Sequence, residues 1–97
     1  MITEQTRAFL ENAVEAATKI RKTNEIISGN NNIPEEGTLL GDTYYCIADM
    51  IKSYLLAIGM KVIEEDQFNN MITIIMFAEK EEINDIVIEY RGNAYVS

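Results

Sequence analysis

Between Thr3 and Ile27, apolar and small residues recur every three or four positions, which is the spacing of one face of an α-helix. The residues in this stripe are Thr6, Leu10, Ala13, Ala17, Ile20 and Ile27, widened by Phe9 and Ala16. The pattern predicts one amphipathic helix within residues 1–27, capped by Thr3. Because the alanines carry little bulk, a neighbouring helix can approach closely, so we expect a helix pair.

The segment Ser28–Gly37 contains three consecutive asparagines and the single proline of the chain, which predicts that the first helix ends near Gly29 and that residues 28–37 form a mobile loop. A second helix is predicted over residues 38–58, with Gly59 as its stop. Because Gly41 could weaken its first turn, Asp42 is an alternative cap. Met60 is then placed to pack back on the helix. Apolar residues spread around this helix beyond one stripe, so we expect it to be largely buried. They are Leu40, Tyr44, Cys46, Ile47, Met50, Ile51, Tyr54, Leu55, Leu56, Ala57 and Ile58.

After Gly59 the apolar pattern favours strands. The predicted strands are Lys61–Glu65, Met71–Ala78 and Ile86–Arg91, with a turn over Asp66–Asn70. A Gly92-Asn93 hairpin turn would place Tyr90 opposite Tyr95 and make Ala94–Ser97 a short edge strand. Residues 60–97 are therefore predicted to form an antiparallel meander. The predicted fold is a single α+β domain, with two N-terminal helices packed on a small antiparallel sheet.

The charges of the chain are unevenly distributed along it. Residues 1–34 hold four acids and four bases, whereas residues 35–97 hold twelve acids and four bases, so the second part carries the whole net charge of -8. Such a surface repels a phosphate backbone and attracts basic proteins, so we predict a basic protein partner and no direct binding to nucleic acid.

The sequence shows neither the pattern of a membrane span nor that of a secretion signal. No apolar run approaches the roughly 18 residues of a membrane span, and the N-terminus lacks the order of a secretion signal. A single cysteine, Cys46, agrees with a reducing compartment. We therefore expect a cytoplasmic protein with no membrane partner.

Catalytic chemistry has little support, because the chain contains no histidine and no matching nucleophile motif. Cys46 lies in an apolar stretch and is interpreted as a buried structural thiol. The acids near Asp66 lack the ligand spacing of a calcium loop. We predict no catalytic residue, no metal site and no cofactor. A minimal enzyme that uses carboxylates and a bound cation ranks last among the hypotheses.

The acids gather near predicted element ends, and these clusters are the candidate partner-binding residues. They are Glu35, Glu36, Asp42, Glu64, Glu65, Asp66, Glu79, Glu81, Glu82 and Asp85. If the fold brings them onto one face, they could imitate a phosphate backbone and occupy the basic groove of a nucleic-acid-handling enzyme. This is the hypothesis of a small acidic inhibitor, encoded by a phage or mobile element. The opposing interpretation is that the charges only keep the protein in solution.

A second hypothesis is a homo-oligomeric structural or regulatory protein. Its candidate self-association residues are Ala13 and Ala17 on the first helix and Tyr90 and Tyr95 near the predicted edge strand. Here the acidic surface serves solubility alone.

Overall fold

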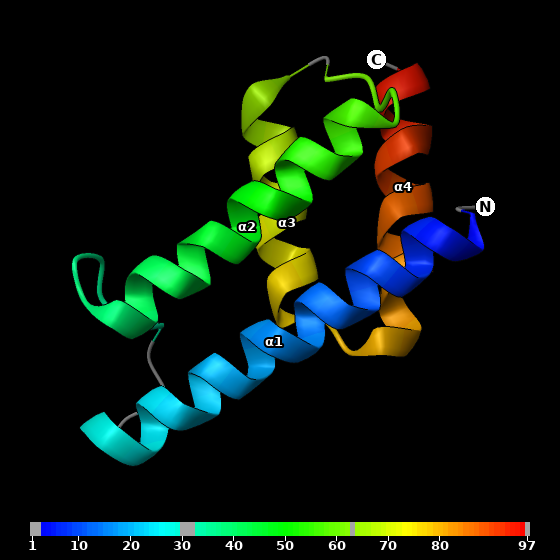
Figure 1. Ribbon diagram of the computed structural model, residues 1–97. Helices are drawn as coiled ribbons and strands as arrows, with labels where there is room; N and C mark the ends of the chain where they lie inside the picture. The colour runs from blue at the N-terminus through cyan, green and yellow to red at the C-terminus, as the bar shows by residue number, and fades with distance from the viewer. Residues whose placement is uncertain (1–2, 30–32, 63, 97) are drawn as a thin grey trace.

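The computed structural model describes residues 3–29, 33–62 and 64–96, with side chains described as far as Tyr90. Its elements are α1 (Glu4–Ser28), α2 (Leu39–Ala57), α3 (Glu65–Phe77), the 3-10 turn η1 (Lys80–Glu82) and α4 (Ile83–Val96). None of the described residues lies in a β-strand. The predicted α+β fold is therefore wrong, and the chain folds as a bundle of helices (Figure 1).

The four helices form an elongated bundle of 43 × 25 × 20 Å. α1 and α2 run antiparallel as a long hairpin, and α3 packs against both of them (Figure 1). α4 packs against α3 and α1, near the N-terminal end of α1. The far end of the hairpin, where α1 ends and α2 begins, projects beyond α3 and α4. We call this end the hairpin tip and define it as residues 22–29 and 33–42.

Both ends of α1 follow the sequence prediction. The Thr3 hydroxyl accepts a hydrogen bond from the backbone N–H of Thr6 at 3.1 Å, which satisfies one of the free donors at the helix start. At the other end Gly29 adopts φ 77°, a left-handed conformation that glycine reaches without strain. Thr3 as cap and Gly29 as stop are thus confirmed.

The C-terminal end of α2 also follows the prediction. The N–H groups of Gly59 and Met60 donate to the carbonyls of Leu56 and Leu55, at 3.1 and 3.0 Å, the paired bonds of a Schellman motif. Gly59 has φ 94°, and Met60 returns to the core with 8% of its surface exposed. Gly59 as stop and Met60 as the residue that packs back are confirmed.

The environment of α2 differs from the prediction. Thr38 is its N-cap, accepting from the N–H of Gly41 at 3.0 Å, so the alternative cap Asp42 is not used. The helix lies on the outside of the bundle, and Cys46, Met50 and Leu56 are exposed. The expectation of a largely buried helix with a buried thiol is wrong. Apolar residues around a helix indicate burial only when neighbours cover every side, and here α1 and α3 cover one.

The segment predicted as a turn over Asp66–Asn70 and a strand over Met71–Ala78 is the helix α3. Its buried residues are Phe68, Met71, Ile72, Ile75 and Met76, spaced by three, one, three and one, which is a helical stripe. Ile74 and Phe77 are about half exposed, at 46% and 48%. Because these two apolar residues lie between the buried ones in the sequence, the run Met71–Ala78 is almost continuously apolar, which is the pattern of a strand buried on both faces. The predicted strand Lys61–Glu65 is also wrong, because Glu65 opens α3 and its described neighbours form the connection from α2.

The predicted hairpin of residues 86–97 is replaced by α4. Ile83, Val87 and Tyr90 are buried at intervals of four and three, so they share one helical face. The helix continues through Gly92 and Asn93 to Val96, so the predicted turn, the edge strand from Ala94 and the Tyr90–Tyr95 pairing are wrong. Ser97, the last residue of that strand, lies outside the described residues. A helix forms here because its apolar stripe finds α3 and α1 to cover it.

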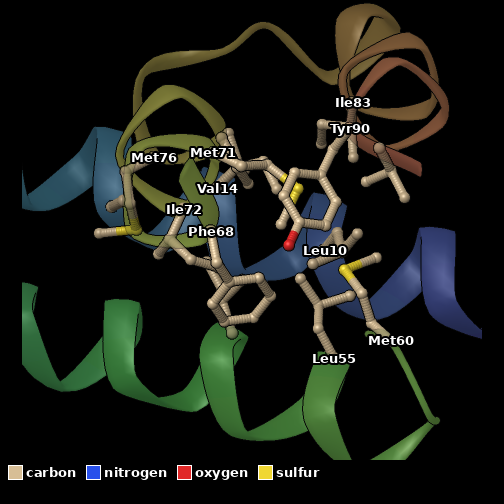
Figure 2. Close-up of a cluster of buried hydrophobic side chains, with 14 of the residues drawn as sticks. Leu10, Val14, Leu55, Met60, Phe68, Met71, Ile72, Met76, Ile83 and Tyr90 are labelled. Carbon is tan, nitrogen blue, oxygen red and sulfur yellow. The ribbon is translucent and has the colours of Figure 1, made fainter. Parts of the chain in front are cut away.

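One core joins all four helices. Figure 2 shows Leu10 and Val14 of α1, Leu55 of α2, Phe68 of α3 and Tyr90 of α4 converging on it. The rings of Phe68 and Tyr90 meet edge to face, with centroids 5.8 Å apart. The Tyr90 hydroxyl donates to the carbonyl of Lys61 at 3.1 Å, which ties α4 to the connection after α2. Burial raises the pKa of this hydroxyl.

Arg21 joins α1 to the end of α3. Its guanidinium donates to the carbonyl oxygen of Met76 and lies over the ring of Phe77, 4.6 Å from the centroid. No basic residue occupies the last turn of α3 itself. A cation from α1 therefore satisfies a terminal carbonyl and complements the negative end of the helix dipole. Of the neighbouring bases Lys19, Arg21 and Lys22 on α1, Arg21 thus has a structural role.

Replacing Tyr44 by phenylalanine should stabilise the protein or leave it unchanged. The ring of Tyr44 is 3% exposed, and its buried hydroxyl has no hydrogen-bond partner. Removing a buried unsatisfied hydroxyl relieves a desolvation cost of roughly 1 kcal/mol. Thermal unfolding followed by circular dichroism measures this effect. Tyr90→Phe is the matched control, because that hydroxyl is bonded and its loss should lower the melting temperature. A clear loss of stability in Tyr44→Phe would contradict the prediction.

Candidate functional site

The acidic clusters lie at three helix starts. Glu35, Glu36 and Asp42 surround the start of α2, and the second cluster, Glu64–Asp66, opens α3. The third cluster opens η1 and α4, and its members are Glu79, Glu81, Glu82 and Asp85. All ten side chains are exposed. Acids near helix N-termini complement the helix dipole, so this placement has a structural reason of its own.

The fold does not bring the three clusters together. The first lies at the hairpin tip, while the second and third lie at opposite ends of α3 (Figure 1). With 13 residues, α3 separates them by about 20 Å at the rise of an α-helix. The three clusters therefore do not form one continuous acidic patch.

The third cluster extends along α4 as an acidic face. Asp85 and Glu89 are spaced by one helical turn, on the side of α4 opposite the buried Ile83 and Val87. We define the acidic α4 face by its four exposed acids Glu81, Glu82, Asp85 and Glu89. Glu89 was missed as a candidate because residues 86–91 were interpreted as a strand. The four-residue spacing of Asp85 and Glu89 is the signal that a helical interpretation would have found.

Lys80, the cation of η1, pairs with an acid of α1 and forms no ion pair with Asp85 or Glu89. Lys80 Nζ lies 2.9 Å from Glu15 Oε2 on α1, and Lys19 Nζ lies 3.5 Å from Glu15 Oε1. The hydrogen bond from Lys80 lowers the pKa of Glu15, and the same bond raises the pKa of Lys80. The ion pair between Lys80 and Glu15 holds η1 against α1. Glu81 still interacts electrostatically with Lys80, whereas Asp85 and Glu89 form no ion pair with any described cation.

The hairpin tip carries the most exposed large apolar side chains of the described residues. Ile26, Ile27 and Leu39 are 84%, 72% and 85% exposed. Ile27 and Leu39 line a groove of about 660 Å³ between the end of α1 and the start of α2. Its other lining residues are Asn24, Ser28, Ile33, Glu35, Thr38 and Leu40.

A tightly built turn positions the acids at this tip. The carbonyl of Glu35 accepts from the N–H and the hydroxyl of Thr38, at 3.3 and 2.6 Å. The N–H of Gly37, at φ 86°, donates to Asp42 Oδ1 at 3.0 Å. Pro34 is fully buried beneath the turn. One carboxylate oxygen of Asp42 is thus engaged within the turn, while Glu35 and Glu36 project from it.

The predicted self-association residues do not lie at the hairpin tip. Ala17 is fully buried and Tyr90 is 8% exposed, so both contribute to the core of their own chain. Ala13 is half-buried and packs on that core. The side chain of Tyr95 lies outside the described residues. Ile26 was missed because it falls beside the predicted α1 stripe, and an apolar residue off the buried stripe is itself a sign of an exposed apolar surface.

Metal and membrane features were searched within the described residues. No group of three or more cysteine, aspartate or glutamate side chains there is arranged to hold a metal ion. Among the same residues, no helix combines the length and the apolar content needed to cross a membrane.

Comparison with known proteins gives no match, whether with protein-family models, curated proteins or solved structures. The function proposed below therefore depends on the geometry and charge of this chain.

Proposed function

We propose that this protein is a non-enzymatic binding protein that engages a basic surface of a partner protein through the acidic α4 face. The supporting observation is the orientation of Lys80, which pairs with Glu15 on α1, so that among the described side chains no cation forms an ion pair with Asp85 or Glu89. Asp85 and Glu89, one turn apart, repel each other by a few tenths of a kcal/mol in the free protein. A basic partner removes this repulsion on binding.

The basic groove of a nucleic-acid-handling enzyme is a suitable partner surface, and occupying it would inhibit the enzyme. Acids four residues apart on a helix are about 6 Å apart along its axis. One strand of duplex DNA carries a charge about every 3.4 Å, so the acidic α4 face is a sparser row of charge than a phosphate backbone. Because the other two clusters lie at separate ends, the proposed mimicry is limited to this short row.

The partner is identified by photo-crosslinking in an extract of the native host. A photo-crosslinking amino acid at Ile88, which is 41% exposed between Asp85 and Glu89, places the reactive group on the acidic α4 face. The same group at Asn69, an exposed position on α3, is the matched control. We expect a basic protein that crosslinks from position 88 alone, with a yield that falls as salt is raised.

The affinity of the purified partner then tests the face directly. The triple variant Glu81→Gln, Asp85→Asn, Glu89→Gln should weaken binding by about 10–100-fold, as expected for three ion pairs of 0.5–1 kcal/mol each. The control Glu64→Gln, Glu65→Gln, Asp66→Asn removes the same charge from the start of α3 and should have a much smaller effect. Equal losses in the two variants would show that net charge alone attracts the partner, and the proposed site would then be wrong.

A further inference from the structure

The hairpin tip carries an apolar groove that α3 and α4 do not cover. Ile27 of α1 and Leu39 of α2 line it and are 72% and 85% exposed. Ile33 and Leu40 add partly buried apolar lining. The volume of about 660 Å³ lies within the range of known binding pockets. Exposed apolar side chains that gather around one groove are typical of an interaction surface.

The charge around this groove is negative. Glu35 lines the groove and Glu36 follows it in the same turn, and both side chains are exposed. None of the described lining residues is a base. The last turn of α1, which is the negative end of the helix dipole, carries no base either. The groove therefore attracts a basic occupant and repels an acidic one.

The neighbouring bases of α1 are directed elsewhere. Lys19 pairs with an acid of its own helix, and Arg21 bonds to the C-terminal end of α3. Lys22 lines a separate recess between α1 and the segment that contains η1. No described cation forms an ion pair with Glu35 or Glu36. A cation from outside the chain can therefore pair with these two acids.

We infer that this groove binds a basic amphipathic helix of another protein. The apolar side chains of that helix pack against Ile27 and Leu39, and its lysine or arginine side chains meet Glu35 and Glu36. An amphipathic helix suits the site because it presents apolar and basic side chains on adjacent sides of one element. The α1–α2 hairpin already accepts a third helix elsewhere along its length, since α3 packs against both of its members. A second copy of this chain, with a net charge of -8, would bring acids to acids.

This groove is separate from the acidic α4 face. The tip and α4 lie at opposite sides of the molecule (Figure 1). In the groove, apolar burial supplies most of the affinity and the acids select a basic occupant, whereas binding at the acidic α4 face depends on charge. Either site can therefore fail its test without the other.

A synthetic amphipathic helix tests the inference, with leucines on one face, lysines on the other and a length of about 15 residues. Amide spectra of the ¹⁵N-labelled protein should show the peptide shifting residues 24–28 and 35–42. The variant Ile27→Ser, Leu39→Ser should weaken binding by about 10–100-fold. Both side chains are exposed, so its helical circular dichroism signal should not change. Ile26→Ser is the matched control, because Ile26 is 84% exposed on the same turn of α1 but does not line the groove. It should leave the affinity unchanged.

The acids of the groove are tested by a second pair of variants. Glu35→Gln, Glu36→Gln should weaken peptide binding by about three- to tenfold and reduce its dependence on salt. Glu64→Gln, Glu65→Gln removes the same charge from the start of α3 and should change the affinity little. A peptide with glutamate in place of lysine should not bind.

Two results would overturn the inference. One is a peptide that shifts no amide at the tip, and shifts confined to α4 would in that case leave the proposed α4 site intact. The other is equal affinity for the wild type and for the variant Ile27→Ser, Leu39→Ser, which would show that the groove does not hold the peptide.

Discussion

Replacing Phe68 by alanine is expected to cost about 3–5 kcal/mol of unfolding free energy, the usual loss for a fully buried phenylalanine. Phe68 is 0% exposed, and its ring meets Tyr90 edge to face at the junction of α3 and α4. Domains of this size have only about 5–15 kcal/mol of stability, so the variant should be largely destabilised at room temperature. Urea unfolding followed by circular dichroism at 222 nm, the helix band, measures the loss.

The neighbouring residue Asn69 provides the matched control. Asn69 is exposed on α3, and alanine is the better helix former by a few tenths of a kcal/mol, so Asn69→Ala should be neutral or slightly stabilising. A hairpin over residues 66–70 predicts the reverse order, because there Phe68 would lie in an exposed turn and Asn69 would be a turn former. A small effect at Phe68 with a large effect at Asn69 would therefore contradict the helical fold.

Replacing Gly41 by alanine is expected to lower the unfolding free energy by about 1–3 kcal/mol, although alanine favours helices by about 1 kcal/mol over glycine. A methyl group at this position would overlap the carbonyl oxygen of Glu35 and approach the Thr38 hydroxyl to 2.9 Å. The first of these contacts is with backbone, so the turn that precedes α2 must move. The melting temperature should fall by about 5–20 °C in a domain of this length.

The control for Gly41 is Thr43→Ala, an exposed substitution in the same part of α2, which should change the melting temperature little. The Gly41→Ala variant should also alter the amide resonances of Gly37 and Asp42, which share a hydrogen bond in the turn. If Gly41→Ala proves more stable than the wild type, helix propensity outweighs the close approach, and the turn does not pack on α2 as described.

The N-terminal half of the fold was predictable because its signals are local. Thr3 and Gly29 act at the ends of α1 through bonds to residues three or four positions away. Gly59 ends α2 in the same manner. Capping and left-handed stops depend on the nearby backbone, so the sequence alone determines them.

The C-terminal half was mispredicted because its apolar residues support two periods. In Met71–Ala78, Ile74 and Phe77 lie outside the buried stripe, and Phe68, which completes the stripe, falls within the predicted turn. A short apolar run cannot distinguish a helix from a strand, because the choice depends on what covers it. α1 and α2 supply a surface for a helix, and Arg21 from α1 satisfies a carbonyl at its end.

The candidate sites, too, were predictable in composition but not in their arrangement in space. The acids at the helix starts, and their excess over bases, could be found from the sequence. Their separation could not, because antiparallel packing decides that α3 and α4 begin at opposite ends. The exposure of Ile26 and Leu39 also depends on where α3 and α4 end relative to the hairpin.

The sequence by itself thus determines the net charge of -8, the two N-terminal helices and the residues that cap or stop them. Tertiary structure alone decides that residues 65–77 and 83–96 are α-helical, that Lys80 is directed to Glu15, and that the hairpin tip stays uncovered. The physical reason is the distance along the chain over which each interaction acts. Caps and charges act within a few residues, whereas burial is shared among segments far apart in the chain, and their packing selects one of the periods that a short apolar run allows.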